Sequence, residues 1–352
     1  MSTDSTVFVV MAGGRGTRFW PRSREQRPKQ FLNILGESSL LRQTVDRVLP
    51  SHGPERIYIA TTTDLADATR RMLPELPAEN VLTEPEGRNT APCLALAMVA
   101  IARRHPEAVM VVLSADHWIG DDARFLEDLR LAVDHASRTR DLVTFGIPPA
   151  YPETGYGYIE TEGEGSVRRA VAFREKPPLE TALAYLQSGR HFWNAGIFVW
   201  RLDDLREDLS THAPGVLGPL DDWERHGGNI EDLPAAYARC EATSIDYALM
   251  EKSARVAVIP ASFRWSDVGS WPALLAFQDK DDEGNAVHGD AVLVDSRDCA
   301  VFGGSRLVAL AGVSDLIVVD EPDALLITHR ERAQGVKNVV EELKRRGRKE
   351  LL

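Results

Sequence analysis

A glycine-rich, basic stretch near the N-terminus constrains this chain more than any other feature. Residues 7–11 form a continuous apolar run, the composition of a parallel strand that is buried on both faces. The run breaks at Ala12 into Gly13, Gly14 and Gly16, and a cluster of basic side chains follows: Arg15, Arg18, Arg22, Arg24, Arg27 and Lys29. Glycine allows tight turns and close approach to a ligand, and successive N–H groups in such turns bind anions. The stretch predicts a polyphosphate site; a solvated glycine-rich turn is the plain alternative.

Two better-known phosphate loops do not fit this stretch. A dinucleotide-binding fingerprint needs a third glycine where Phe19 stands, so a dehydrogenase is disfavoured. A Walker loop needs Gly-Lys-Ser/Thr after four spacer residues, and that sequence is missing from the stretch. The predicted phosphate site therefore belongs to another class of nucleotide-binding protein.

Composition limits the partners of this chain. The 352 residues suffice for one main domain and a smaller one. The net charge of −12 argues against nucleic-acid or anionic-membrane binding. The three cysteines, Cys93, Cys240 and Cys299, lack metal-site spacing and indicate buried thiols in a reducing compartment. With no apolar leader and no 18-residue uncharged run, we expect a cytoplasmic protein.

The first half of the chain alternates between strands and helices. Apolar runs predict strands at 7–11, 56–62, 80–83, 109–113 and 142–147. Helical periodicity predicts helices at 39–49, 64–73, 91–102 and 123–137; the first should stop at Pro50, and Thr90 should cap the third. This alternation predicts an α/β fold with a doubly wound, mostly parallel, Rossmann-like sheet. Ligands bind outside the carboxyl ends of such strands, so the Gly13 loop, the Gly87 loop and Asp116 should converge.

Beyond Tyr151 the pattern changes to strands broken by turns. One strand, at 192–200, has a break of small residues, and Ser244 should cap a helix that runs through Lys252. Short alternating runs with Gly and Asp turns between about 285 and 328 predict a small β-rich domain, and a polar helix is expected over 330–346. We expect a catalytic domain at 1–284 and a C-terminal domain at 285–352 that ends in this helix. The sequence leaves the oligomeric state open; β-rich appendages often mediate dimers, which makes a homodimer the assembly to test.

Two aspartates follow predicted strands. Asp116 comes after the strand 109–113, and Asp267 comes after a short strand at 263–265. Each could be a turn residue that bonds its own backbone. Together they suit Mg²⁺, which is typically held by one or two carboxylates plus substrate phosphates.

Several of these motifs resemble the sugar-1-phosphate nucleotidylyltransferases. The loop from Gly13 to Arg18, with Trp20-Pro21 and Pro28-Lys29-Gln30-Phe31, is similar to the family opening, and the last two spellings are similar to its mannose-1-phosphate guanylyltransferase branch. Ser114-Ala115-Asp116-His117 and the stretch 265–271 resemble its two acidic metal motifs. Phe19 and Ser114 stand where the family commonly has Leu and Pro. The resemblance runs from about Val7 to Trp271 and is weak beyond Asn285.

The resemblance implies roles for individual residues. It implies catalytic roles for Arg18, Lys29, Asp116 and Asp267, the two aspartates as ligands of Mg²⁺, with Mn²⁺ as a substitute. It implies nucleotide contacts from Ala12, Gly13, Gly14, Gly16, Thr17, Arg18, Lys29, Glu84, Gly87, Arg88, Asn89 and Asp116. It implies sugar-phosphate contacts from Gly157, Glu175, Lys176 and Asn194. Simpler structural roles stay open: a helix-capping loop at 84–90, a surface ion pair at Glu175-Lys176 and a left-handed turn at Asn194. Lys29 is expected on the loop with little burial.

The reaction implied is GTP plus mannose 1-phosphate giving GDP-mannose plus diphosphate. Attack of the sugar phosphate on the α-phosphorus is in line, so catalysis needs positioning and charge stabilisation and no protein nucleophile. Alternatives are a transferase for another sugar 1-phosphate, a glycosyltransferase and a non-catalytic nucleotide-sugar-binding homologue. A glycosyltransferase usually presents Asp-x-Asp where this chain has Ala115-Asp116-His117. Longer family members append a phosphomannose isomerase domain, which we do not expect in this chain.

Overall fold

The computed structural model describes residues 5–14 and 16–352, so Arg15 of the predicted phosphate loop lies outside the described residues. The chain forms two compact units. Unit 1 comprises the described part of Met1–Gly13 together with Thr44–Ala115 and Ile119–Trp265; unit 2 comprises Gly14–Gln43 without Arg15, Asp116–Trp118 and Ser266–Leu352. These two units differ from the predicted catalytic domain at 1–284 and C-terminal domain at 285–352. Those domain boundaries stay a prediction.

Unit 1 is built on a nine-stranded mixed sheet. In spatial order its strands are β3 (Val81–Glu84), β2 (Ile57–Thr62), β1 (Thr6–Met11), β4 (Val109–Ser114), β9 (His191–Arg201), β6 (Leu142–Ile147), β10 (Val256–Pro260), β8 (Arg168–Arg174) and β7 (Tyr158–Glu162). Strands β1 to β4 are mutually parallel, as the alternation predicts, and so are β6 and β10. The α/β prediction is confirmed.

The sequence did not predict the place of β9. This strand runs antiparallel between β4 and β6, which local alternation would have made neighbours. Its register with β6 shifts between Thr144 and Gly146, and on β9 itself Gly196 has a φ of 65°. The small-residue break in the β9 sequence therefore marks an irregularity of the strand, which glycine tolerates.

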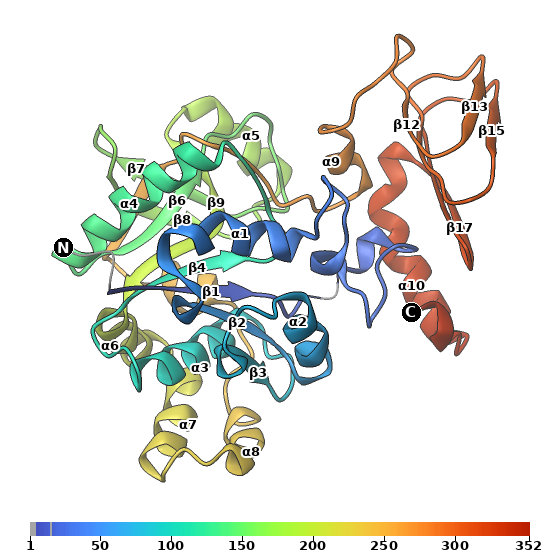
Figure 1. Cartoon of the computed structure of the whole chain (residues 1–352). Helices are drawn as coiled ribbons and strands as arrows, with labels where there is room; N and C mark the ends of the chain where they lie inside the picture. Colours follow the sequence, from blue (N-terminus) through green and yellow to red (C-terminus); the bar gives the residue numbers. More distant parts are fainter. Residues whose placement is uncertain (1–4, 15) are drawn as a thin grey trace. The chain divides into compact units, whose positions relative to one another are not determined.

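Helices cover both faces of the sheet of unit 1, with α4 on one face and α3 and α6 on the other (Figure 1). The helices of the chain are α1 (Leu40–His52), α2 (Ala66–Met72), α3 (Thr90–Ala102), α4 (Asp122–Arg138), α5 (Leu179–Ser188), α6 (Leu202–His212), α7 (Pro214–Arg225), α8 (Leu233–Tyr237), α9 (Trp271–Leu275) and α10 (Val336–Arg345). Helix α3 is buried along most of its length and forms the centre of the core of unit 1. This agrees with its almost wholly apolar sequence.

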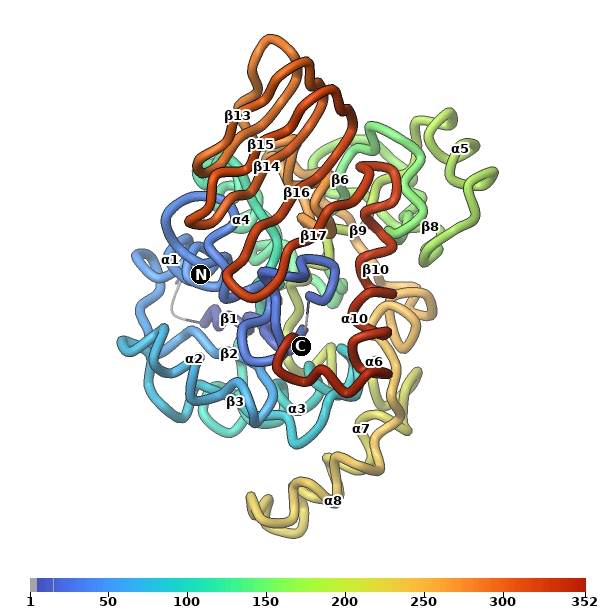
Figure 2. Tube along the Cα trace, turned by 90° about the vertical axis from the view of Figure 1, so that its right-hand side faces the viewer, coloured from blue at the N-terminus to red at the C-terminus, as the bar shows by residue number. Residues whose placement is uncertain are grey.

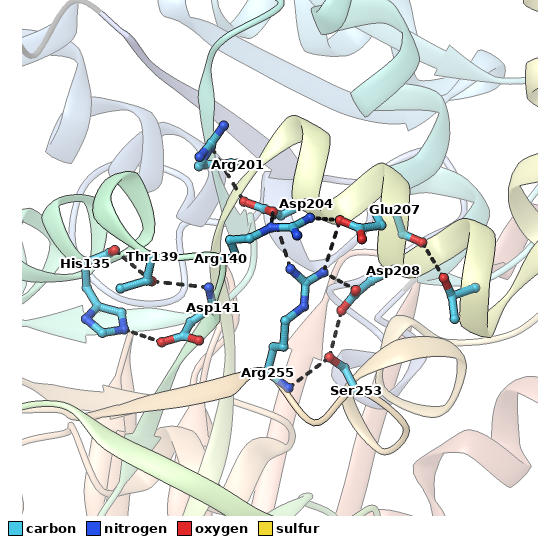
Figure 3. Close-up of polar contacts among 11 residues, drawn as sticks. His135, Thr139, Arg140, Asp141, Arg201, Asp204, Glu207, Asp208, Ser253 and Arg255 are labelled. Atoms are coloured by element: carbon cyan, nitrogen blue, oxygen red, sulfur yellow. Dashed lines mark hydrogen bonds and ion pairs between the residues drawn. The ribbon is translucent and has the colours of Figure 1, made fainter.

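Charged side chains attach α6 to the start of strands β6 and β10, at the end of the sheet opposite the carboxyl ends of β1, β3 and β4. Figure 3 shows the carboxylates of α6 facing Arg140 and Arg255. Arg255, just before β10, contacts Asp208 and lies 3.4 Å from Asp204, and both of these carboxylates are buried. Arg140, just before β6, bonds Asp204 at 3.0 Å. Both arginines come just before parallel strands, so they lie at the end of the sheet away from the loops that follow β1, β3 and β4. The network therefore has a structural role.

Unit 2 contains the predicted β-rich region, which winds into coils. Strands β12 (Ala286–His288), β14 (Ala300–Phe302) and β16 (Leu316–Glu321) stack in parallel, and β17 (Ala324–His329) closes that sheet antiparallel. A second parallel pair is formed by β13 (Ala291–Val294) and β15 (Val308–Ala311). Figure 2 shows these coils one above the other, followed by the C-terminal helix α10. A separate two-stranded sheet pairs β5 (Trp118–Gly120) with β11 (Arg264–Ser266).

Three local predictions need correction. Asn89, not Thr90, caps α3, with its side chain accepting from the Thr90 N–H at 2.8 Å. Helix α1 continues past Pro50 to His52, so the proline lies in its last turn, where little helix follows the missing N–H. The helix expected after Ser244 is a π-helical turn over Asp246–Met250.

Candidate active site

The glycine-rich turn of unit 2 packs directly against Lys29. Gly16 has a φ of 57°, and a Cβ built on it would lie 2.3 Å from the Cβ of Lys29. The Phe19 N–H donates to the Gly16 carbonyl at 3.1 Å and so begins the turn Thr17–Phe19. Phe19 is buried beside Trp271, with ring centroids 5.0 Å apart. Phe19, which occupies the position of the third glycine in a dinucleotide fingerprint, is therefore a core residue here.

Lys29 is buried, which corrects the expectation of an accessible loop lysine. Only 3% of its surface is exposed. Its ammonium donates to Asp116 Oδ2 at 2.9 Å and to the backbone carbonyl of Asp267 at 2.5 Å. A buried lysine needs such partners, because an uncompensated charge away from water is costly. Lys29 thus joins the two predicted metal motifs, although Asp267 lies 238 residues further along the chain.

Asp116 is held in its ionised form by this lysine. Burial alone would raise the pKa of its carboxyl, but the Lys29 charge and hydrogen bond, with a smaller contribution from His117, hold the pKa below its ordinary value. His117 shows the opposite balance, because burial lowers the pKa of its imidazole despite the nearby Asp116 charge. The residue pair therefore presents a carboxylate beside a neutral imidazole.

These residues line one cavity of about 290 Å³ in unit 2. Its lining consists of Gly16, Thr17, Arg18, Phe19, Lys29, Asp116, His117, Asp267, Gly269 and Lys337. The cavity brings together all four residues to which the sequence analysis gave catalytic roles. Arg18 reaches the Gly269 carbonyl at 3.5 Å, and the Gly269 N–H donates to Asp267 Oδ1 at 3.1 Å. Among residues 5–14 and 16–352, no group of three or more His, Cys, Asp or Glu side chains gathers as a metal site, so Asp116 and Asp267 offer only a pair of carboxylates.

The loop 84–90, which the resemblance predicts to contact the nucleotide, lies in unit 1, whereas Gly14 belongs to unit 2. Gly14 and Gly87 each have open space where a Cβ would point, whereas a Cβ on Gly13 would come within 3.3 Å of Glu84 Oε1. Ala12 is buried, and its N–H donates to the Ala60 carbonyl at 2.7 Å. Ala12 thus continues the hydrogen-bond pattern of the sheet past the end of β1. At Gly14 and at Gly87, no neighbouring atom blocks the predicted close approach of a ligand to the backbone.

Glu84 is buried and already has a hydrogen-bond partner within the chain. It is buried at the end of β3, and Tyr237 donates its hydroxyl to Glu84 Oε2 at 2.5 Å. Burial raises the pKa of Glu84, and hydrogen bonds from Tyr237 and Cys93 offset only part of that shift. Glu84 therefore anchors its loop to α8, and its nucleotide role stays a prediction.

Arg88 and Asn89 also hold this loop. Arg88 donates to Glu86 at 2.7 Å and to the Cys240 carbonyl at 2.8 Å. Asn89 has a φ of 69° and caps α3, so the helix-capping alternative for the loop is correct whatever it binds.

The predicted sugar-phosphate residues form a second cluster in unit 1. A Cβ on Gly157 would lie 2.5 Å from Glu175 Oε2, so a larger residue would displace that carboxylate from its present position. The Asn194 N–H donates to the Gly157 carbonyl at 2.8 Å. Lys176 bonds Glu175 at 2.8 Å, which raises the pKa of its ammonium. The structure thus brings these four residues together, and Asn194 lies on β9 instead of in the left-handed turn offered as an alternative.

Two residues lining these clusters were missed by sequence reasoning. Asp246, at the start of the π-helical turn, accepts from Asn194 Nδ2 at 2.8 Å. Its burial and the Glu175 charge raise the pKa of Asp246 to about 6. The segment Ser244-Ile245-Asp246 resembles an ordinary helix start, which gave no signal of this contact. Lys337 lines the Lys29 cavity from α10 and lies in the region where the family resemblance is weak.

Comparisons with known proteins identify the family of this chain. Residues 7–284 match the nucleotidyl transferase family. The chain belongs to this family. Residues 289–343 match the mannoseP isomerase/GMP-like beta-helix domain, which describes the coils of unit 2. This nucleotidyltransferase has relatives over nearly its whole length.

Three relatives illustrate this similarity. The mannose-1-phosphate guanylyltransferase of Klebsiella pneumoniae is 40% identical over 353 residues, which cover 97% of this chain and 74% of that protein. The alginate biosynthesis protein AlgA of Pseudomonas fluorescens is 39% identical over 98% of this chain and 73% of its own length. A solved mannose-1-phosphate geranyltransferase from Thermus thermophilus superposes with a TM-score of 0.89 at 36% identity, covering 97% of this chain and 99% of that one.

None of the helices in the described part of this nucleotidyltransferase combines the length and apolarity needed to cross a membrane.

Proposed function

We propose that this nucleotidyltransferase is a mannose-1-phosphate guanylyltransferase that converts GTP and mannose 1-phosphate into GDP-mannose and diphosphate. The observation that carries the proposal is the double contact of the Lys29 ammonium with the Asp116 carboxylate and the Asp267 backbone. This contact joins the glycine-rich turn and both acidic motifs in one cavity. The choice of guanine and mannose is supported by the name of the Klebsiella relative, at 40% identity over 97% of this chain.

The chemistry follows from the phosphates. An oxygen of the sugar phosphate forms a bond to the α-phosphorus of the nucleotide, while the bond from that phosphorus to the bridging oxygen breaks. The electron pair leaves with diphosphate, and no proton has to move. Such a reaction depends on orientation and on cationic groups preorganised around the phosphates.

The chain's own side chains fit these tasks. Arg18 lines the cavity and offers planar, bidentate donors to phosphate oxygens. Lys29 holds Asp116 and Asp267 in place and keeps Asp116 ionised. Glu175, Lys176 and Asn194 are assigned to the sugar phosphate, where hydroxyl groups would meet the Glu175 carboxylate and the phosphate would meet Lys176.

The donor set of the cavity fits a hard divalent cation. Asp116 and Asp267 both line it, and Mg²⁺ takes oxygen ligands from one or two carboxylates and from substrate phosphates. When bound, Mg²⁺ or Mn²⁺ would neutralise charge on the phosphates. Asp116 and Asp267 are the residues that would hold it. The three buried thiols suit a reducing compartment, and the cytoplasm remains the expected location.

Diphosphate release tests this proposal. The purified chain is given GTP, ATP, UTP or dTTP, each with mannose 1-phosphate, with glucose 1-phosphate or with no acceptor. We expect release with GTP and mannose 1-phosphate and little release without an acceptor. Equal release with glucose 1-phosphate, or release only with another nucleotide, would contradict the assigned substrates.

Matched variants test the acidic pair. Asp116→Asn and Asp267→Asn should each abolish most turnover, and the double variant should be little worse, because the two act as a unit. Asp134→Asn, an exposed aspartate of α4, is the control and should retain activity. Full activity in excess EDTA would overturn the metal role without affecting the assigned reaction.

A further inference from the structure

We infer that Lys337, on the C-terminal helix α10, is a further phosphate-binding residue of the Lys29 cavity and contacts the β- and γ-phosphates that leave as diphosphate. The inference rests on the proposed function, because it takes a nucleoside triphosphate as the occupant of the cavity. It also gives the C-terminal segment a direct part in substrate binding.

The position of Lys337 is set by its neighbours on α10. Val336 and Val340 lie one turn apart on the same face of the helix and are only 2% and 6% exposed. Both belong to the core of unit 2, as does Phe19 of the glycine-rich turn. Helix α10 therefore packs against Thr17–Phe19, and its first turn is held beside the cavity. Lys337 follows Val336 directly, is exposed, and lines the cavity.

The two lysines of the cavity differ in their partners. Lys29 uses two of its three N–H donors on Asp116 and the Asp267 carbonyl. In the described part of the chain, no hydrogen bond or ion pair links the side-chain ammonium of Lys337 to another residue. Lys29 therefore organises the acidic residues, while the ammonium of Lys337 keeps its donors for a ligand.

Charge balance favours an anion at Lys337. The chain carries a net charge of −12, so a polyphosphate must be attracted by local cations. The first turn of α10 contains no acidic residue that would neutralise Lys337, and the helix dipole is positive at that end. Negative charge grows on the leaving diphosphate during nucleotidyl transfer, so a cation on this group stabilises the transition state.

Binding of inorganic diphosphate tests the inference. Isothermal titration of the full chain with diphosphate in the presence of Mg²⁺ compares wild type, Lys337→Gln and Lys337→Arg. A lost charge-assisted hydrogen bond should weaken diphosphate binding about tenfold or more in Lys337→Gln. Lys337→Arg should restore affinity to within about threefold. Lys344→Gln is the control, because Lys344 lies on the same helix, pairs with Glu25 at 3.5 Å and does not line this cavity.

Steady-state kinetics separate a phosphate contact from a structural role. Lys337→Gln should raise KM for the nucleotide and leave KM for the sugar phosphate within about twofold, since none of the assigned sugar-phosphate residues lines this cavity. Wild-type diphosphate affinity in Lys337→Gln, or an equal rise in both KM values, would overturn the inference. Diphosphate binding requires neither base nor sugar. If the chain does not make GDP-mannose but Lys337→Gln still weakens diphosphate binding, the proposed function is refuted and this inference stands.

Discussion

Gly16→Ala tests whether the glycine-rich turn sets the position of Lys29. An alanine Cβ at this position would lie 2.3 Å from the Cβ of Lys29 and 3.0 Å from its backbone nitrogen. Rotation of the lysine side chain moves neither atom, so the backbone itself must shift. The left-handed conformation, at a φ of 57°, costs a non-glycine residue about 1–2 kcal/mol. Overpacking adds roughly 1–3 kcal/mol.

The expected effect on catalysis is larger than the effect on folding. A backbone shift of about 1 Å at Lys29 would move its ammonium away from Asp116 and Asp267, and a displacement of that size costs roughly 10²-fold in rate. We expect kcat/KM for diphosphate release to fall by about 10²-fold, together with a lower Tm in thermal unfolding.

Gly14→Ala is the matched control in the same loop. A Cβ on Gly14 meets nothing within 4 Å, and its φ is not positive, so Tm should stay at the wild-type value. Its activity should fall only if a phosphate approaches the Gly14 backbone, as the sequence predicts. Wild-type kcat/KM and Tm in Gly16→Ala would refute the coupling between the turn and Lys29.

Three further predictions use the same assays and unfolding experiments. Lys29→Ala should lower kcat/KM by about 10²-fold or more. The pKa of Asp116, followed by NMR, should rise in this variant because the neighbouring cation is lost, and an unchanged pKa would contradict the pairing. Asp208→Ala should destabilise the chain by about 1–3 kcal/mol in urea unfolding, because donors of Arg255 and Ser253 lose their buried acceptor. Its KM values should not change, and a catalytic defect in the folded variant would argue against a purely structural network. The folded state raises the pKa of Asp246 from 3.8 to about 6, so between these values it retains a proton that the unfolded chain releases. The Tm of wild type should therefore fall relative to that of Asp246→Asn as pH rises from about 4 to about 6, and parallel Tm profiles would refute the shifted pKa.

Much of this protein could be predicted from local sequence. Apolar runs identified the strands that became β1, β2 and β4, because burial on both faces requires a continuous apolar segment whatever lies beside it. The spacing of Gly13, Gly14 and Gly16 identified the turn after β1 for a similar reason, since backbone conformation is a local property. Asp116 could be placed at a strand end from its position after an apolar run, and that edge of a parallel sheet is where ligands bind.

Other features depended on contacts between distant segments and required the tertiary structure. The antiparallel position of β9, the burial of Lys29 and the contact of Lys29 with Asp267 all follow from which segments pack together. Asp246 and Lys337 looked like ordinary helix residues, because their importance comes from the cluster or cavity that they face. Local patterns determine whether a residue suits a strand, turn or helix. The chemical environment of a side chain is decided by residues far away in the sequence, whose approach depends on the pairing of strands and the packing of the whole core.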